Sequence, residues 1–148
     1  MKLQFGTARP GLNYRHRHAT FGLAERDGLL ACVRVDRGEA TYYDLPGGAV
    51  DGDESEQQAL VREFGEEAGL VIQPQDRLTE AAQYFHKTDG EAINNSGGFW
   101  LVSIEGEKPE LKCEDDHELV WLDPTYAMAH LRHEAHAWAV TRWLRARA

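Results

Sequence analysis

Cysteine, long apolar runs and a signal-like N-terminus are scarce or missing in this chain of 148 residues. It has only 2 cysteines, Cys32 and Cys113, and no C-x-x-C pair, so a disulfide framework is excluded and free thiols in a reducing compartment are expected. No stretch approaches the roughly 18 apolar residues of a membrane span. The N-terminus also lacks the apolar core of a signal peptide. Together these absences favour the cytoplasm and no membrane association.

Positive charge is also in short supply. The chain has 16 Lys and Arg residues against 25 Asp and Glu residues, which gives a net charge of −9. This argues against broad binding of nucleic acid through a basic surface. It does not exclude a small phosphorylated substrate, because a metal ion can reverse the local charge of an acidic site. The length suits a single domain, residues 1–148, acting as a monomer or a homodimer.

The most informative stretch runs from Gly48 to Leu70 and reads GAVDGDE, then seven residues, then REFGEEAGL. At about 100° per residue, a helix over Ser55–Ala68 would place on one face the apolar side chains Leu60, Val61, Phe64 and Ala68. The opposite face would carry the three carboxylates Glu63, Glu66 and Glu67. Like charges three or four residues apart repel, and a divalent cation such as Mg²⁺, which prefers oxygen ligands, would remove that cost. The alternative is a solvated acidic face with Arg62 as its counter-charge.

Glycine and capping residues bracket this predicted helix. The run Leu45-Pro46-Gly47-Gly48 indicates a turn at which glycines permit a close backbone approach. Either Asp53 or Ser55 would cap the start of the helix. Gly69 would end the helix.

The same stretch resembles the Nudix box, in which Gly, five residues, Glu and seven residues precede Arg-Glu-aliphatic-any-Glu-Glu-any-Gly-aliphatic. Every fixed position of that pattern is matched here, by Gly48, Glu54, Arg62, Glu63, Glu66, Glu67, Gly69 and Leu70. The single departure is Phe64, which stands where the family has an aliphatic residue. Because phenylalanine is also apolar, we expect it to pack inward.

The resemblance implies an α/β fold, the Nudix-type α/β/α sandwich, in which a mixed β-sheet lies between helices. It also implies a metal-dependent pyrophosphohydrolase that cleaves a nucleoside diphosphate linked to another moiety, with nucleoside triphosphates among the candidates. Water would attack a phosphorus atom. The implied cofactor is Mg²⁺, with Mn²⁺ as the alternative, and the implied partner is a small phosphorylated substrate, in the first instance a nucleotide.

By the same resemblance, the catalytic residues would be Glu63, Glu66, Glu67 and Arg62. The three glutamates would bind the metal ion, with the carbonyl of Gly47 beside them. Arg62 would orient a carboxylate through a bidentate pair. Glu54 is the candidate partner, and this pair would support the ligands from outside the metal shell. One of the three glutamates, or an acid in a loop, would activate the water, and the sequence leaves open which.

Two further sets of contacts are less constrained by sequence. The resemblance implies one more acidic ligand from the loop before the last strand, where the candidates are Glu114, Asp115, Asp116 and Glu118. Of these we expect Asp115 or Glu118, and a solvated acidic loop is the alternative. The candidates for substrate contact are Tyr84, Asn94 and Trp100, for which core or loop positions are the alternative.

Basic and histidine-rich segments lie outside the box. The N-terminal segment contains Arg15 and Arg17 and could form a phosphate-contacting lip, although a solvated edge is the simpler interpretation. Three histidines recur at residues 130, 133 and 136, but the spacing does not match the H-E-x-x-H motif of zinc proteases. We therefore expect them on the surface or in packing positions.

The remaining pattern predicts a mixed sheet covered by helices on both faces. Apolar alternation and turn residues predict strands at residues 18–25, 29–35, 41–45, 82–86, 99–104 and 118–122. The first two would form a hairpin around Asp27-Gly28. Residues 71–79 would be a connection or short strand, and residues 87–98 a loop. Residues 124–148 predict a helix in two pieces that part near residues 130–133.

Two other functions are compatible with the box. One is a non-catalytic Nudix domain that senses nucleotides; such domains often lose box glutamates, and none is lost here. The other is a hydrolase of a non-nucleotide diphosphate, such as an isoprenoid or sugar diphosphate. Only the residues of the substrate pocket would separate these alternatives.

Overall fold

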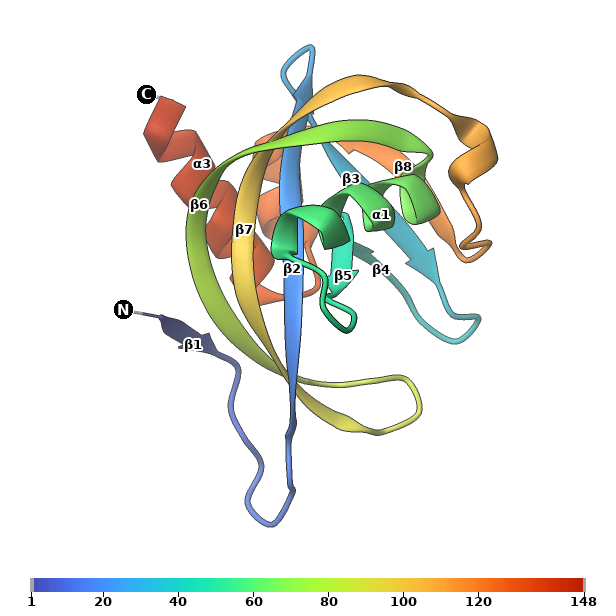
Figure 1. The fold of residues 1–148 in the computed structure, drawn as a ribbon. Coiled ribbons are helices and arrows are strands. Elements are labelled where there is room, and N and C mark those ends of the chain that lie inside the picture. Colours follow the sequence, from blue (N-terminus) through green and yellow to red (C-terminus); the bar gives the residue numbers. More distant parts are fainter. Residues whose placement is uncertain (1, 148) are drawn as a thin grey trace.

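The computed structural model describes residues 2–147 and contains a mixed β-sheet with helices on both of its faces (Figure 1). In chain order the elements are β1 (Leu3–Phe5), β2 (Arg15–Arg26), β3 (Leu29–Asp36), β4 (Thr41–Asp44), β5 (Gly47–Ala49), α1 (Glu56–Ala68), β6 (Leu70–His86), β7 (Ala92–Glu107), η1 (Pro109–Leu111), β8 (His117–Leu122), α2 (Pro124–His130) and α3 (Glu134–Arg147). None of the described helices is long and apolar enough to cross a membrane.

The sheet runs in the order β1-β6-β7-β2-β3-β4, with β5 paired to β2 and β8 paired to β3. Strand β1 is parallel to β6 and β2 is parallel to β7, whereas the other pairs are antiparallel. The predicted mixed sheet between helices is therefore confirmed. The first hairpin is also confirmed: Asp27 (φ 54°) and Gly28 (φ 81°) turn the chain, and β2 and β3 pair only next to this turn.

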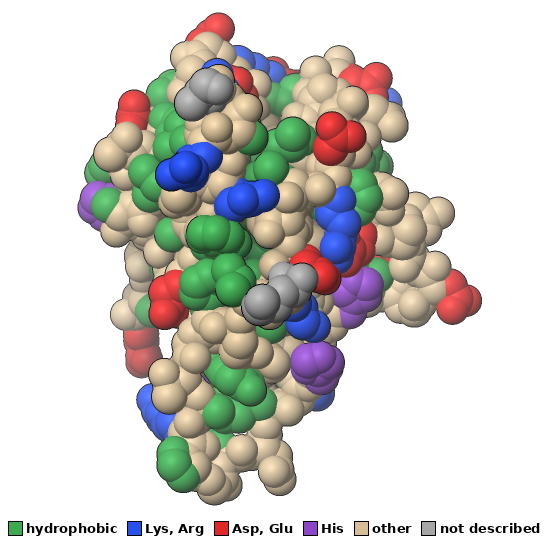
Figure 2. Space-filling view, turned by 90° about the vertical axis from the view of Figure 1, so that its left-hand side faces the viewer, with side chains coloured by type: hydrophobic (Ala, Val, Ile, Leu, Met, Phe, Trp, Pro, Cys, Tyr) green, Lys and Arg blue, Asp and Glu red, His purple; other side chains and the backbone are tan. Residues whose placement is uncertain are grey.

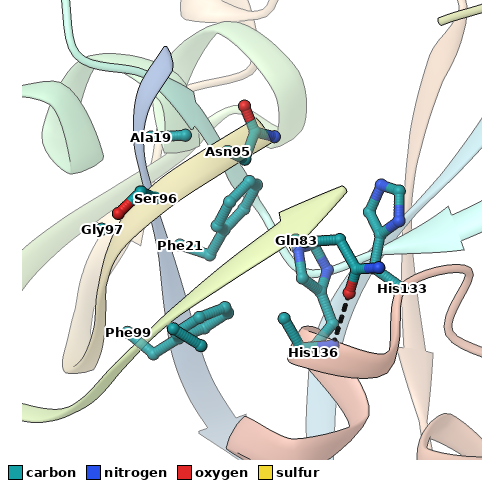
Figure 3. Close-up of a pocket in the computed structure, with 11 residues that line it drawn as sticks. Ala19, Phe21, Gln83, Asn95, Ser96, Gly97, Phe99, His133 and His136 are labelled. Carbon is teal, nitrogen blue, oxygen red and sulfur yellow. Dashed lines mark hydrogen bonds between the residues drawn. The ribbon is translucent and has the colours of Figure 1, made fainter. Parts of the chain in front are cut away.

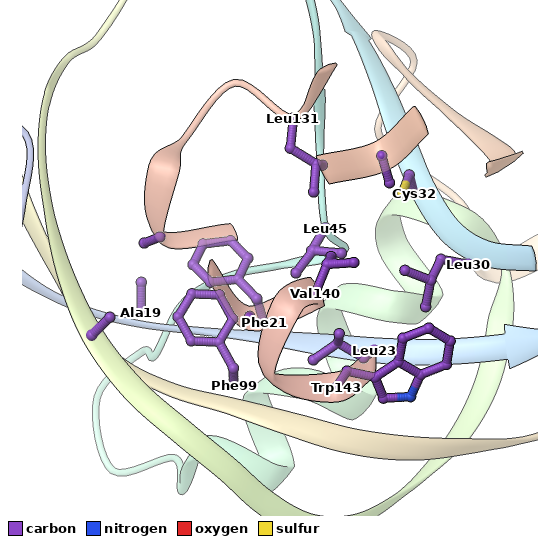
Figure 4. Packing of buried hydrophobic residues seen from close by; sticks show 14 residues of the cluster. Ala19, Phe21, Leu23, Leu30, Cys32, Leu45, Phe99, Leu131, Val140 and Trp143 are labelled. Carbon is purple, nitrogen blue, oxygen red and sulfur yellow. The ribbon is translucent and has the colours of Figure 1, made fainter. Parts of the chain in front are cut away.

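Two apolar cores form because neighbouring residues of a strand point to opposite faces of the sheet. Leu23 of β2 joins the cluster packed against α2 and α3, which also contains Val140 and Trp143 (Figure 4). The next residue, Ala24, joins the other cluster, which lies beneath α1. On the outer face that carries β1, β6 and α3, acidic and basic side chains are interspersed and do not form one basic patch (Figure 2).

Helix α1 lies close to the sheet through its apolar stripe. Leu60 and Phe64 are both 0% exposed, and a Cβ at Gly22 of β2 would come within 2.7 Å of the Phe64 ring. The predicted inward face is thus confirmed for Leu60, Phe64 and Ala68. It is wrong for Val61, which is 45% exposed because it lies at the edge of the stripe.

The ends of α1 follow the predicted capping chemistry. Ser55 is the N-cap: its hydroxyl accepts from the backbone N–H of Gln58, and the Gln58 side chain accepts from the Ser55 N–H. Ser55 therefore fills the role for which Asp53 was the alternative. At the other end, Gly69 adopts the left-handed conformation (φ 66°) and its N–H donates to the carbonyls of Gly65 and Phe64.

Residues 71–79, expected to be a connection or short strand, belong to the long strand β6, and the predicted loop at residues 87–98 is correct only for residues 87–91. Strand β6 is continuous over 17 residues with irregular register near Pro74, and β7 covers 16 residues. The glycines in β7 serve close approach instead of a turn. A Cβ at Gly97 would lie 1.9 Å from the Ala19 carbonyl oxygen, and one at Gly98 would lie 2.4 Å from a Glu56 carboxylate oxygen.

The N-terminal segment differs from the prediction, whereas the C-terminal helices agree with it. The N-terminal segment contains β1 and the first residues of β2, where no strand was expected. The C-terminal helix is broken where predicted, between His130 and Glu134. Residue 148, the predicted end of that helix, lies outside the described residues.

Replacing Phe64 by Ala should cost about 3–5 kcal/mol of the free energy of unfolding, because it empties a fully buried site between α1 and the sheet. Val61→Ala on the same helix removes exposed surface and should change stability by less than about 0.5 kcal/mol. Urea unfolding of both variants checks this. Equal losses would show that α1 is not held by this stripe.

Candidate functional site

A cavity of about 300 Å³ lies at the junction of α1, β5 and the loop that precedes β8. Its lining combines acidic side chains from α1 and that loop with glycines of β5 and cationic side chains from β2, the β3–β4 turn and the α2–α3 connection. The residues are Arg17, Phe21, Arg37, Tyr42, Asp44, Gly47, Gly48, Ala49, Glu63, Glu67, Asn95, Glu114, His117, Arg132 and His133. Sequence segments far apart in the chain therefore meet at one end of the sheet.

Glu67 is the most buried acid of this cavity, with 7% of its surface exposed. One carboxylate oxygen accepts from the backbone N–H of Gly47 at 3.0 Å, and the other lies 3.4 Å from Nε2 of His117. Burial raises the pKa of Glu67 well above its ordinary value, and the charge of Glu63 raises that pKa further. The sequence placed Glu67 on an exposed helix face, but strand β5 and the start of β8 cover it.

Glu63 lies one helical turn before Glu67 and faces Gly48. A Cβ at Gly48 would come within 2.9 Å of the Glu63 carboxylate, so only glycine leaves room for this side chain. Burial is the main cause that raises the pKa of Glu63 to about 7, while its hydrogen bond from Arg62 (2.9 Å) acts in the opposite direction. Two carboxyl groups with raised pKa values therefore face one cavity.

Arg62 makes most of the ionic contacts next to the cavity. Its Nε and one Nη donate to both oxygens of Glu54, at 2.8 and 2.9 Å, so the expected bidentate pair is present. The guanidinium also donates to the carbonyl of Ala49 at 3.0 Å and to Glu66 at 3.3 Å. The hydrogen bond from Arg62 lowers the pKa of Glu54 to about 2. Arg62 thus ties the start of the box, strand β5 and two acids of α1 together.

Glu66 faces the loop before β8 and is not part of the cavity lining. Its backbone carbonyl accepts from the N–H groups of Cys113 and Glu114, at 2.9 and 3.1 Å. Its carboxylate, the Cys113 thiol and the Glu114 carboxylate have ligand atoms within 4.8 Å of one another. These hydrogen bonds attach the loop before β8 to Glu66, and they place Glu114 next to the cavity.

The structure places the loop acids differently from our expectation. Asp115 and Glu118 are exposed and do not line the cavity, whereas Glu114 does. Asp116 forms an ion pair with Arg37 and lies 2.8 Å from Nδ1 of His117. Because side chains alternate along β8, Glu118 points away from the face that His117 occupies. Glu114 is the loop acid that the geometry brings to the site.

The three residues expected to contact substrate also lie elsewhere. Trp100 is buried beneath α1 and its indole N–H donates to Glu56 at 2.8 Å. Asn94 exchanges hydrogen bonds with Gln4 of β1, at 3.0 and 3.2 Å, and Tyr84 packs against Tyr14. None of the three lines the cavity among the described residues.

Arg17, a candidate for the phosphate-contacting lip, also lines the cavity. Sequence reasoning missed the remaining lining side chains, among them Tyr42, Asp44, Asn95, Arg132 and His133. Strand alternation explains one of them, since Asn95 follows Asn94 in β7 and points to the opposite face. Strand alternation alone does not tell which of the two asparagines faces the cavity, because that depends on the elements packed against each face of β7.

A second cavity of about 350 Å³ adjoins the first and shares with it Arg17, Arg37, Tyr42 and Arg132. It adds Phe85, Lys87, Thr88 and Asp89 to the lining. The guanidinium carbon of Arg132 lies 3.7 Å from the Tyr42 ring centroid, and the same side chain donates to the Asp44 carboxylate at 2.8 Å. The two cavities form one cleft, acidic at the α1 end and cationic and aromatic at the other.

His133 lines the first cavity, and His133 and His136 together line a smaller adjoining pocket (Figure 3). His136 is 2% exposed and its Nδ1 accepts from the N–H of Leu45 at 3.1 Å; His133 is 5% exposed. Burial lowers the pKa of His133 to about 3 and that of His136 well below its ordinary value. Both are neutral packing histidines near pH 7. Gln83, whose amide oxygen accepts from the backbone N–H of Ala135 at 2.9 Å, holds the start of α3 against the sheet (Figure 3).

Comparison with known proteins adds an independent finding. The family model for the NUDIX domain matches residues 15–144. The CTP pyrophosphohydrolase of Escherichia coli (strain K12) is 32% identical over 111 residues, which cover 73% of this chain and 76% of that protein. A NUDIX hydrolase from Nitrosomonas europaea has a TM-score of 0.74 at 19% identity, covering 89% of this chain and 90% of that chain. The MutT protein from Methanosarcina mazei Go1 has a TM-score of 0.69 at 22% identity, covering 93% and 99%. The two structures share the fold of this chain.

The raised pKa of Glu63 predicts a specific pH dependence of stability. A carboxyl group whose pKa rises from 4.5 to about 7 on folding stabilises the fold fully below 4.5, and this contribution is lost as the pH rises through 7. Gln at this position does not titrate. In EDTA, the melting temperature of Glu63→Gln relative to wild type should therefore increase by several degrees from about pH 5 to about pH 8. A difference that does not change with pH would contradict the burial of this charge.

Proposed function

Because the chain belongs to the Nudix family of hydrolases, we propose that it is a metal-dependent pyrophosphohydrolase of nucleotides. The reaction would be attack of water on a phosphorus atom of a nucleoside diphosphate linked to another moiety. The observation that carries the proposal is the meeting of Glu63 and Glu67 beside Gly47 and Gly48 at one cavity. Similarity to a CTP pyrophosphohydrolase favours a nucleoside triphosphate as substrate.

The donor set suits a hard divalent cation. Glu63 and Glu67 offer carboxylate oxygens within a partly buried cavity, and Glu66 and Glu114 lie at its edge. The pKa values of Glu63 and Glu67 are raised, which means that the protein alone compensates their negative charge poorly. Nudix hydrolases use divalent metals, and an all-oxygen set is what Mg²⁺ prefers, with Mn²⁺ as an alternative. An ion held there would neutralise phosphate charge during attack by water.

The chain's own residues then have distinct tasks. The N–H of Gly47 and the imidazole of His117 fix the two oxygens of Glu67. Arg62 fixes Glu63 from behind while its fork engages Glu54. Such supporting contacts keep ligands in one orientation, and their loss commonly costs about 10–100-fold in affinity or activity. We assign Glu54 and Arg62 to this supporting role and Glu63, Glu66 and Glu67 to the cation.

The second cavity gives room for the rest of the substrate. Tyr42 and Phe85 contribute aromatic rings to its lining, and aromatic side chains suit contact with a base. We assign base contact to this region instead of Tyr84, Asn94 and Trp100, which lie outside the cleft. We further propose that residues 1–148 act as one domain on a small nucleotide in the cytoplasm, as a monomer or a homodimer.

A nucleotide-sensing role without catalysis is the second candidate. The observation in its favour is the cationic and aromatic end of the cleft, which would suffice for binding. Against it stands the complete set of box glutamates together with the Arg62–Glu54 pair. Hydrolysis of a non-nucleotide diphosphate would use the same acidic end, so the substrate panel must include such compounds.

A hydrolysis screen tests the function. The panel contains nucleoside triphosphates, dinucleotides, nucleotide sugars, ADP-ribose and isoprenoid diphosphates, each with Mg²⁺ or Mn²⁺. We expect metal-dependent release of a nucleoside monophosphate, greatest with a nucleoside triphosphate. If no compound of the panel is hydrolysed but one nucleotide raises the melting temperature, the protein is a nucleotide sensor and not an enzyme.

Glu67→Gln is the matched control for that screen. The amide oxygen of Gln can still accept from the Gly47 N–H, so the fold should persist while the charge is lost. We expect turnover to fall by at least about 100-fold. Wild-type turnover at saturating Mg²⁺ would remove Glu67 from the catalytic set.

A further inference from the structure

Arg17 differs from the other cations of the cleft. Among the described residues, Arg132 is paired with Asp44, Arg37 with Asp116, and Lys87 lies 3.5 Å from Glu91. Arg17, by contrast, has no carboxylate within ion-pair distance in residues 2–147 and yet is partly buried in the wall shared by both cavities. A guanidinium withdrawn from water without a counter-ion is costly.

The partner of Arg17 is instead a neutral amide. Strands β2 and β7 are parallel here and Arg17 stands opposite Asn95 in the register. Its Nε donates to Oδ1 of the Asn95 side-chain amide at 2.7 Å (Figure 3 shows Asn95 beside the smaller pocket, which it also lines). This contact uses the Asn95 acceptor and leaves the amide NH₂ and the terminal nitrogens of Arg17 as donors. Two neighbouring strands thus present a pair of donor groups on one side of the cleft.

Charges of both signs act on Arg17: the acids Glu91 and Glu63 favour its charged form, whereas burial and two neighbouring cations disfavour it. Burial lowers the pKa of Arg17 from its ordinary value, and the charges of Arg15 and Arg132 lower it further. An anion in the cleft would relieve both effects, because it would replace lost hydration and screen the like charges. A bidentate phosphate contact is the pairing that a planar guanidinium makes best.

We propose that Arg17 and Asn95 form a phosphate-binding pair that holds the third (γ) phosphate of the substrate, beyond the bond that is cleaved. Resting on the proposed function, this makes the enzyme selective for substrates with a third phosphate, such as nucleoside triphosphates, over diphosphates and nucleotide sugars. Both residues line the same cavity as Glu63 and Glu67, and Arg17 also lines the second cavity, so the pair shares one space with the acids proposed to hold the cation. The basic N-terminal segment thereby acquires a specific role in place of a solvated edge.

A binding test separates this proposal from the hydrolase activity. The probe is inorganic tripolyphosphate in EDTA, with inorganic phosphate in a parallel arm, and the readout is the melting temperature. Tripolyphosphate should stabilise wild type and Arg15→Ala, but not Arg17→Ala. Arg15 is a suitable control because it lies on the same face of β2, is exposed, is paired with Glu91 and does not line the cleft. Equal stabilisation of Arg17→Ala, or none of wild type, would overturn the proposal.

Asn95→Asp provides a second variant for the case in which Arg17→Ala folds poorly. It places a carboxylate 2.7 Å from Arg17, where the amide oxygen now accepts. The fold keeps its cross-strand contact while the guanidinium is neutralised from within. We expect it to lose tripolyphosphate binding as Arg17→Ala does, and retention of binding would contradict the proposal.

The kinetic arm uses a nucleoside triphosphate and the corresponding diphosphate. Arg17→Ala should lower kcat/KM for the triphosphate by roughly 10–100-fold, since a charged hydrogen-bonding pair is lost. The diphosphate should be affected much less. Equal losses on both substrates would overturn the selectivity claim. Absence of turnover in wild type, with tripolyphosphate binding that depends on Arg17, would instead show that the proposed hydrolysis fails while the phosphate site stands.

Discussion

The burial of two carboxyl groups, Glu63 and Glu67, at one cavity is the constraint on which the rest of this site depends. Both carboxyl groups are withdrawn from water at one end of α1, and burial raises both pKa values. The fold tolerates this arrangement because Phe64, between them in sequence, is fully buried and anchors the helix on the sheet. Glycines at 47 and 48 let strand β5 approach the two acids, one through its N–H and one through the absence of a side chain. The two buried carboxylates therefore lower the stability of the fold, and a bound divalent cation would restore that stability.

The second half of the cleft is built from segments that have nothing in common in sequence. The start of β2, the β3–β4 turn, the end of β6 and the α2–α3 connection each contribute a basic or aromatic side chain. Arg132 illustrates how they are held: its backbone N–H donates to Tyr43 and its guanidinium engages Asp44 and covers Tyr42. The cleft is acidic at one end and basic at the other. This suits a substrate with two or more phosphates, one contacted through a cation at the acidic end and another contacted directly by arginine side chains at the basic end.

Sequence patterns predicted what is local and missed what is tertiary. The Ser55 cap, the Gly69 stop, the inward Phe64 and the Arg62–Glu54 pair all involve residues within one stretch, so spacing and helical geometry sufficed. The length of β6 and β7 was missed because Pro74 and the glycines at 97 and 98 are turn residues in isolation; their real roles depend on strands and a helix that arrive from elsewhere. The burial of Glu67 and the choice of Glu114 over Asp115 likewise depend on which loop is fastened to α1.

The central claim is that Glu63 and Glu67 jointly form a cation site within the cleft. Its most direct test is Mn²⁺ binding to the substrate-free protein, measured by the electron paramagnetic resonance signal of the Mn²⁺ that stays free in solution. Wild type and the double variant Glu63→Gln/Glu67→Gln are compared at a pH above 7, the value to which burial raises the pKa of Glu63, because a bound cation requires deprotonated carboxylates. The account predicts that wild type binds Mn²⁺ and that the double variant loses this binding. Unchanged binding by the double variant would contradict it and move the cation site to other acids.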